Sequence, residues 1–104
     1  MSQKIKNICK LFDIYSLESI LDGDMKLSDE NIQILLNCDD RDMFHLTIYF
    51  YNKYDICCTH IDRYYQNGIL ELHINDCITN ENMCIKFENT IKKNISTKSA
   101  RKIV

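Results

Sequence analysis

Between residues 43 and 51, apolar side chains alternate with more polar ones. The apolar members of this run are Phe44, Leu46, Ile48 and Phe50. A period of two is typical of a β-strand that buries one face and exposes the other. We therefore predict a strand over residues 43–51.

Clusters of turn-forming residues divide the rest of the chain into runs of similar length. Asn67-Gly68 lies between two alternating runs, an arrangement typical of a two-residue β-hairpin turn. Polar clusters at 52–55 and 79–82 separate the neighbouring runs. Together these turns predict an antiparallel meander of four strands. Its strands would span residues 43–51, 56–66, 69–78 and 83–91.

The N-terminal part of the chain has a different period. Its apolar residues recur at helical spacing, and they include Ile5, Ile8, Leu11 and Phe12. This pattern predicts one or more helices between residues 2 and 22. Residues 28–38 fit two patterns: Ser28 followed by two acidic residues is a typical helix start, whereas Ile32, Ile34 and Leu36 alternate as in a strand. We favour a strand there.

A chain of 104 residues has room for one modest hydrophobic core, so we expect a single domain over residues 1–104. The predicted fold class is α+β. An N-terminal helix or helices (2–22) would precede an antiparallel β-meander of four to six strands (about 25–91), with the sheet covered on one face. A basic C-terminal tail would follow at 92–104.

The predicted turns also fix which residues face each other. The Asn67-Gly68 turn sets Gln66 opposite Ile69, so Asp62 pairs with His73. A tight turn at 79–82 would set Ile78 opposite Met83. Even-numbered residues from 44 to 50 and odd-numbered residues from 57 to 65 then share the buried face. All three histidines of the chain would lie on the opposite, polar face.

That polar face offers ligand types for a metal ion. One predicted row across the four strands contains His45, Asp62, His73 and Glu88. Imidazoles with carboxylates can bind zinc or non-haem iron. The same row also fits a solvated ladder of charged and hydrogen-bonded pairs, which needs no metal and is the reading we favour. A second row holds Cys58, Cys77 and Cys84, with His60 beside it, and is a weaker zinc hypothesis. We expect no cofactor.

Charge is distributed unevenly along the chain. The net charge is −2, yet the segment after Asn89 carries five basic residues and no acidic one. These are Lys92, Lys93, Lys98, Arg101 and Lys102. They form an alternative, nucleic-acid-binding hypothesis. The rest of the chain has a charge of −7 and would repel phosphate groups, which disfavours a sheet face that binds nucleic acid.

Outward-facing aromatic residues favour contact with another protein. Tyrosine is enriched at the centres of protein interfaces. The candidate partner-binding residues are Tyr49, Tyr51, Tyr64 and His60. We interpret the chain as a small intracellular protein-interaction module, and an edge strand of its sheet could also pair with a second copy to form a homodimer.

The chain lacks the motifs of the common enzyme classes. It has no phosphate loop and no dinucleotide fingerprint, and its two glycines leave little room for a cofactor to approach the backbone. Cys58 and His60 are close in sequence, but no turn or helix start beside them could hold an oxyanion. We expect no enzymatic activity.

The remaining composition bears on the setting of the protein. No apolar run is long enough to span a bilayer and no cleavable leader is evident, so we expect a cytoplasmic protein with its six cysteines reduced. Residues with AT-rich codons dominate, while the chain has only two glycines and no proline. This skew points to an AT-rich genome, such as that of a virus or phage, and suggests a protein that modulates a host factor in the host cytoplasm.

Overall fold

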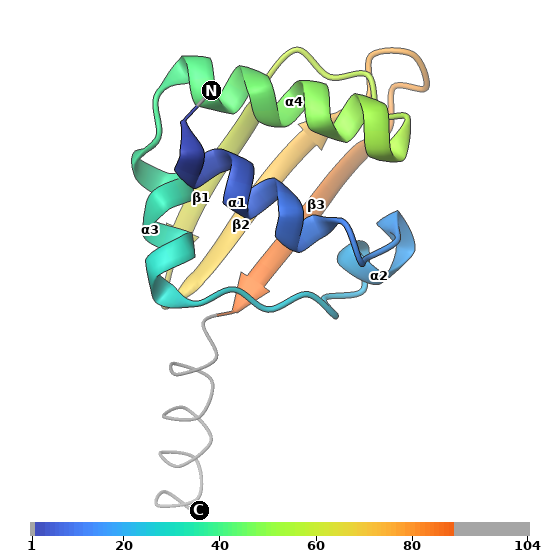
Figure 1. The fold of residues 1–104 in the computed structure, drawn as a ribbon. Helices are drawn as coiled ribbons and strands as arrows, with labels where there is room; N and C mark the ends of the chain where they lie inside the picture. Colours follow the sequence, from blue (N-terminus) through green and yellow to red (C-terminus); the bar gives the residue numbers. More distant parts are fainter. Residues whose placement is uncertain (1, 89–104) are drawn as a thin grey trace, which may run out of the picture.

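The computed structural model describes residues 2–88, and residue 1 and residues 89–104 lie outside that range. Within it, four helices precede one antiparallel sheet of three strands (Figure 1). The predicted α+β class is confirmed. The helices are α1 (Gln3–Phe12), α2 (Leu17–Leu21), α3 (Asp29–Asn37) and α4 (Asp40–Tyr54). The strands are β1 (Ile61–Gln66), β2 (Ile69–Asn75) and β3 (Asn82–Glu88), in the spatial order β1-β2-β3.

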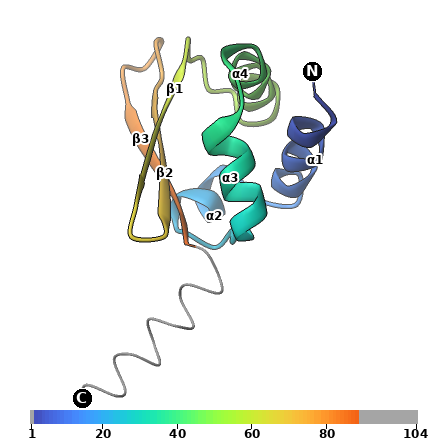
Figure 2. The same ribbon diagram turned by 90° about the vertical axis from the view of Figure 1, so that its left-hand side faces the viewer.

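The described helices all lie on one side of the sheet (Figure 2). In this view α1 is the helix farthest from the strands, although its last residue, Phe12, reaches down to the sheet. The ring of Phe12 lies 5.2 Å from that of Phe50 on α4 and 5.9 Å from that of Phe87 on β3, both in edge-on geometry. All three phenylalanines are fully buried. This aromatic cluster joins the helices to the strands, and edge-on ring pairs add to the free energy of burial.

Side-chain caps set the starts of the helices. The hydroxyls of Ser2, Ser16 and Ser28 each accept a hydrogen bond from a main-chain N–H three residues later, and the carboxylate of Asp39 does the same for α4. Such caps satisfy N–H groups that have no partner within the helix. Over residues 2–88, no helix reaches the length and hydropathy that a bilayer crossing requires.

The predicted strand at 43–51 is wrong, because this segment lies inside α4. Its buried residues are Met43, Leu46, Thr47 and Phe50, which have the i, i+3, i+4, i+7 spacing of one helix face. Leu46 and Phe50 belong to both the helical and the alternating pattern, and Met43 and Thr47 decide between them. The cap at Asp39 and the acidic first turn also favour the helix.

The strand favoured at 28–38 is wrong as well. Ser28 caps α3, and the helix buries Ile32 and Leu35 against the core. The predicted meander over about 25–91 therefore begins at Ile61 in the described chain and contains three strands rather than four to six. The segment between α4 and β1 is also not a strand, because Asp55 ends α4 in a left-handed conformation and residues 56–60 connect the two elements.

The β1–β2 hairpin has the predicted register. Asn67 and Gly68 both have positive φ angles, as a type I′ turn requires, and Gln66 pairs with Ile69. Asp62 lies opposite His73 as predicted. This hairpin is the part of the sheet in which local turn chemistry alone determines the pairing.

The pairing of β2 with β3 differs from the prediction by four residues. Met83 lies opposite Ile74 rather than Ile78, because the loop between the strands spans residues 76–81. The carboxylate of Asp76 organises this loop by accepting hydrogen bonds from the N–H groups of Ile78 and Thr79. A shift by an even number keeps every side chain on its predicted face but changes its partner.

Candidate functional site

One face of the sheet points away from the helices, and we call it the outer face. Its side chains come from alternate residues on each strand. By the observed register they form the rows Asp62, His73, Cys84 and Tyr64, Glu71, Lys86, with Gln66, Ile69 and Glu88 beyond them. The intervening residues, including Leu70, Leu72 and Ile85, are buried beneath the helices.

Three potential metal ligands lie together on the outer face. The Nε2 atom of His73 is 2.8 Å from a carboxylate oxygen of Glu71, and the thiol of Cys84 donates to the same oxygen at 3.6 Å. One ligand atom from each residue lies within 4.8 Å of the other two. Among the described residues, Glu71, His73 and Cys84 are the one group of at least three histidine, cysteine, aspartate or glutamate side chains whose ligand atoms lie this close together.

The contacts within this group shift its acidities. The hydrogen bond with His73 is the main cause that lowers the pKa of the Glu71 carboxyl, which keeps this group ionised. Partial burial raises the pKa of the Cys84 thiol, and the charge of Glu71 raises it further. The Cys84 thiol therefore stays protonated and donates a hydrogen bond to the Glu71 carboxylate.

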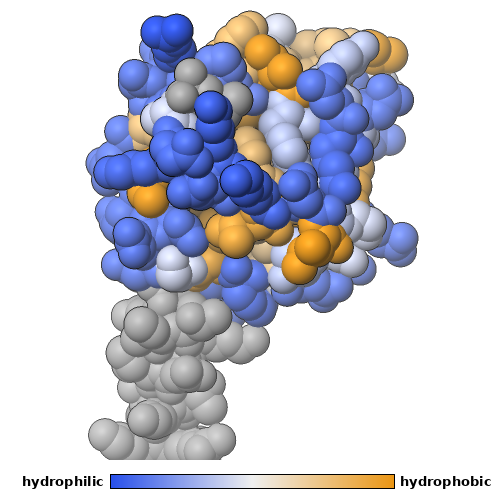
Figure 3. Space-filling model, viewed as in Figure 1, coloured by the Kyte–Doolittle hydropathy of each residue, from blue (hydrophilic) through white to orange (hydrophobic). Residues whose placement is uncertain are grey.

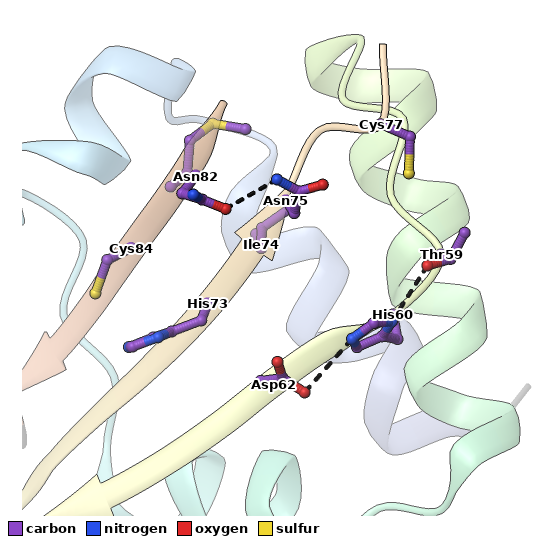
Figure 4. A pocket seen from close by; sticks show the side chains of 10 residues that line it. Thr59, His60, Asp62, His73, Ile74, Asn75, Cys77, Asn82 and Cys84 are labelled. Atoms are coloured by element: carbon purple, nitrogen blue, oxygen red, sulfur yellow. Dashed lines mark hydrogen bonds and ion pairs between the residues drawn. The ribbon is translucent and has the colours of Figure 1, made fainter. Parts of the chain in front are cut away.

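A hollow of about 340 Å³ opens beside the group, at the end of the sheet where β2 leaves for the 76–81 loop (Figure 4). His60 and Asp62 lie on one side of it, with a nitrogen-to-oxygen distance of 3.7 Å. Asn75 and Asn82 lie on another and are hydrogen-bonded at 2.8 Å. His73 and Cys84 also line this hollow, so a small polar ligand or ion has access to them.

The metal set predicted from sequence is not brought together. His45 lies on α4, where it lines a hollow shared with α1, and so belongs to the helical layer. Glu88 pairs with Ile69 rather than standing in the His73 row. Asp62 and His73 do face each other across β1 and β2. Cys84 takes the place predicted for Glu88 because of the four-residue shift.

The predicted cysteine row does not form either. Cys58 lies in the connection between α4 and β1, and Cys77 lies in the 76–81 loop, where its N–H donates to the carbonyl of Cys57. Cys84 is on β3, opposite His73. All six cysteines are free thiols.

The four predicted partner-binding residues lie on different surfaces. Tyr64 is exposed on the outer face, where its ring lies 4.5 Å from the His73 ring. His60 is exposed and lies immediately before β1. Tyr51 is exposed on α4. Tyr49 is half-buried between α1 and α4, and its hydroxyl donates to the Asp13 carboxylate.

Sequence reasoning missed an apolar surface on α4. Phe44, Ile48 and Tyr51 are 57%, 40% and 53% exposed, and we call these three residues the α4 stripe. Their spacing of i, i+4, i+7 places them on one side of the helix. On the helical side, hydrophobic residues lie along the upper edge, over α4, and also in the lower half of the same face (Figure 3). The alternating pattern places Phe44 and Ile48 on the buried face of a strand, which hides this surface.

One end of the α4 stripe opens into a second hollow. Phe44 lines a cavity of about 250 Å³ together with Thr59 and His60 from the segment before β1. Asp40 and Arg63 also line it. His60 therefore contributes both to this hollow and to the one on the outer face.

The predicted nucleic-acid contacts cannot be placed. Lys92, Lys93, Lys98, Arg101 and Lys102 all lie outside the described residues.

Comparison with known proteins identifies no relative: no family model matches the chain, and no curated protein or solved structure matches it.

Proposed function

We propose that this protein is an interaction module that binds a basic amphipathic helix of another protein through the α4 stripe. The observation that carries the proposal is the exposure of Phe44, Ile48 and Tyr51 along one side of α4. Single exposed apolar residues are common on any protein surface. Three large ones aligned over two helical turns form a ridge of the kind that packs against a partner helix.

The negative charge of this protein favours a positively charged partner. Residues 2–88 hold eight basic residues and fifteen acidic ones, a charge of −7. Asp40 precedes the α4 stripe and Asp55 follows it, and both are exposed, as are the basic residues Arg41 and Lys53 on the same helix. Lysine or arginine residues at the rim of a partner helix would be attracted to these carboxylates, which raises the rate of association and disfavours acidic partners.

The hollow beside Phe44 supports a specific contact. A cavity of about 250 Å³ can accept one large side chain of a partner, and buried anchors of this kind provide much of the binding energy of interfaces. The proposed setting is a reducing compartment such as the cytoplasm, in which six free thiols persist.

A pair of designed peptides tests this proposal. The two helical peptides share one apolar face and differ only in having lysines or glutamates at its rim. We expect the full-length protein to bind the lysine peptide at least tenfold more tightly, by fluorescence anisotropy at low salt, and the preference to shrink as salt is added.

Matched variants locate the binding surface. Ile48→Asp should weaken binding at least tenfold, which corresponds to about 1.4 kcal/mol. Ile14→Asp is the control, because Ile14 is 84% exposed and lies outside the α4 stripe. Equal affinity for both peptides, or equal losses in the two variants, would contradict the proposal.

A further inference from the structure

Nitrogen, sulfur and oxygen ligands meet at one point on the outer face. His73 and Cys84 lie directly opposite each other on β2 and β3. The two-residue hairpin makes Gln66 and Ile69 a hydrogen-bonded pair, so odd-numbered residues of β2 direct their main-chain groups toward β1. His73 and Cys84 are therefore a non-hydrogen-bonded pair, the kind in which facing side chains lie closest.

Glu71 completes the set from the same strand. It stands two residues before His73, so it projects from the same face, and it lies diagonally across from Cys84. Its carboxylate already bridges the other two residues, at 2.8 Å from the His73 nitrogen and 3.6 Å from the Cys84 sulfur. All three ligands thus come from the strands β2 and β3, and none of them lies on a loop.

These separations are close to those that a tetrahedral zinc ion needs. With metal-to-ligand distances of about 2.0–2.3 Å, ligand atoms around zinc lie roughly 3.3–3.8 Å apart. The observed ligand atoms all lie within 4.8 Å of one another. Since His73 and Glu71 are partly exposed, small rotations of their side chains suffice to admit the ion.

We propose that Glu71, His73 and Cys84 form a zinc-binding site, with the fourth coordination position open to water. A thiolate and an imidazole favour zinc over magnesium or calcium, which prefer oxygen ligands alone. The carboxylate and the thiolate together balance the two positive charges of the ion. This site is independent of the α4 stripe, which lies in the helical layer.

Two charged neighbours face the site. Lys86 lies opposite Glu71 on β3 and opposes a cation, although its long, exposed side chain can turn away into solvent. Asp62 lies opposite His73 on β1 and adds a negative charge on the other side. The hollow lined by Asp62, His73 and Cys84 gives the ion a route from solvent.

Cobalt provides a spectroscopic test on the full-length chain. Co²⁺ added to the reduced protein should give one equivalent of a complex with a thiolate-to-cobalt charge-transfer band and the visible bands of tetrahedral coordination. Cys84→Ser should lose the charge-transfer band. Cys58→Ser and Cys77→Ser are the controls and should keep it, because neither thiol belongs to the group.

Zinc affinity tests the other two ligands. Glu71→Gln and His73→Ala should each weaken Zn²⁺ binding at least tenfold in competition with a chromophoric chelator. The matched controls Glu81→Gln and His45→Ala should leave it unchanged, and circular dichroism checks that each variant is folded.

The site is disproved if the wild-type protein gives no charge-transfer band, if the band survives in Cys84→Ser, or if the control variants lose zinc as the ligand variants do. Ile48→Asp should bind zinc normally, which separates this test from that of the α4 stripe.

Discussion

The guanidinium of Arg63 on β1 donates a hydrogen bond of 2.7 Å to the main-chain carbonyl of Leu35 in the last turn of α3. The same nitrogen lies 3.3 Å from the carbonyl of Leu36 and 3.0 Å from that of Cys38. Carbonyls at the end of a helix have no partner within it. Arg63 thus satisfies them from the sheet and joins the two layers.

Removal of this contact should destabilise the protein. We expect Arg63→Met, which keeps the apolar stem, to lower the free energy of unfolding by about 2 kcal/mol, since hydrogen bonds to charged groups contribute roughly 1.5–3 kcal/mol. Urea titration measures it. Arg41→Met is the control, because Arg41 is exposed on α4, and its effect should stay within about 0.5 kcal/mol. Equal effects would mean that the contact with α3 contributes nothing.

Two phenylalanines test the assignment of buried and exposed faces. Phe12 is fully buried, whereas Phe44 is 57% exposed. Phe12→Ala should lower the free energy of unfolding by about 3–5 kcal/mol, because it leaves a cavity between Phe50 and Phe87. Phe44→Ala should change it by less than about 0.5 kcal/mol. A large loss in Phe44→Ala would show that the α4 stripe is covered in the folded protein.

A single glycine should stabilise the end of α4. Asp55 has a φ angle of 58°, a conformation that glycine adopts without steric cost, and its N–H donates to the carbonyls of Phe50 and Tyr51. Asp55→Gly should therefore raise the thermal midpoint, with a gain of about 0.5–1 kcal/mol. Asn52→Gly, inside the same helix, should lower it. A lower midpoint in Asp55→Gly would contradict the observed helix end.

Stability should fall at alkaline pH. Burial raises the pKa of the Cys9 thiol to about 11 and that of the Tyr54 hydroxyl to about 12, from ordinary values of 9.0 and 10.0. Both pKa values are higher in the folded protein than in the unfolded chain. The resulting contribution to the free energy of unfolding is therefore fully present below about pH 9 and is lost as the pH rises toward 12. Ionised Tyr54 could no longer donate to the carbonyls of Phe12 and Tyr15.

Urea midpoints measured from about pH 8 to pH 11 check this dependence. Cys9→Ala removes one of the titrations with a raised pKa, so its midpoint should fall less steeply over that range. Cys77→Ala is the control, because Cys77 is an exposed cysteine. A midpoint that stays constant up to about pH 11 would contradict the assigned burial.

The sequence predicted the structure best where local chemistry decides it. Asn67-Gly68 determines both its turn and the pairing of Asp62 with His73. Asn and Gly readily adopt the two successive positive φ angles that a type I′ turn requires. In α4 the two periods share Leu46 and Phe50, so alternation alone could not exclude a helix. Met43 and Thr47 carried the missing information, together with the cap at Asp39.

The candidate zinc site, too, could be predicted only in part from the sequence. Glu71 and His73 share a face of one strand, which follows from sequence alone. Their contact with Cys84 depends on the length of the 76–81 loop, which Asp76 and the left-handed Asn80 determine. Turn-forming residues at 79–82 indicated that a turn exists but not how many residues it contains. Non-local pairing of this kind cannot be read from composition or periodicity.

The most direct test of the proposed function is an amide chemical-shift titration of the labelled full-length protein with the lysine-rimmed helical peptide. We expect the shifts to concentrate on the exposed side of α4 around Phe44, Ile48 and Tyr51 and on the adjoining Thr59 and His60. The amides of β2 and β3 on the outer face should stay unchanged. Shifts centred on the outer face, or no saturable shifts on α4, would show that the α4 stripe is not the binding surface.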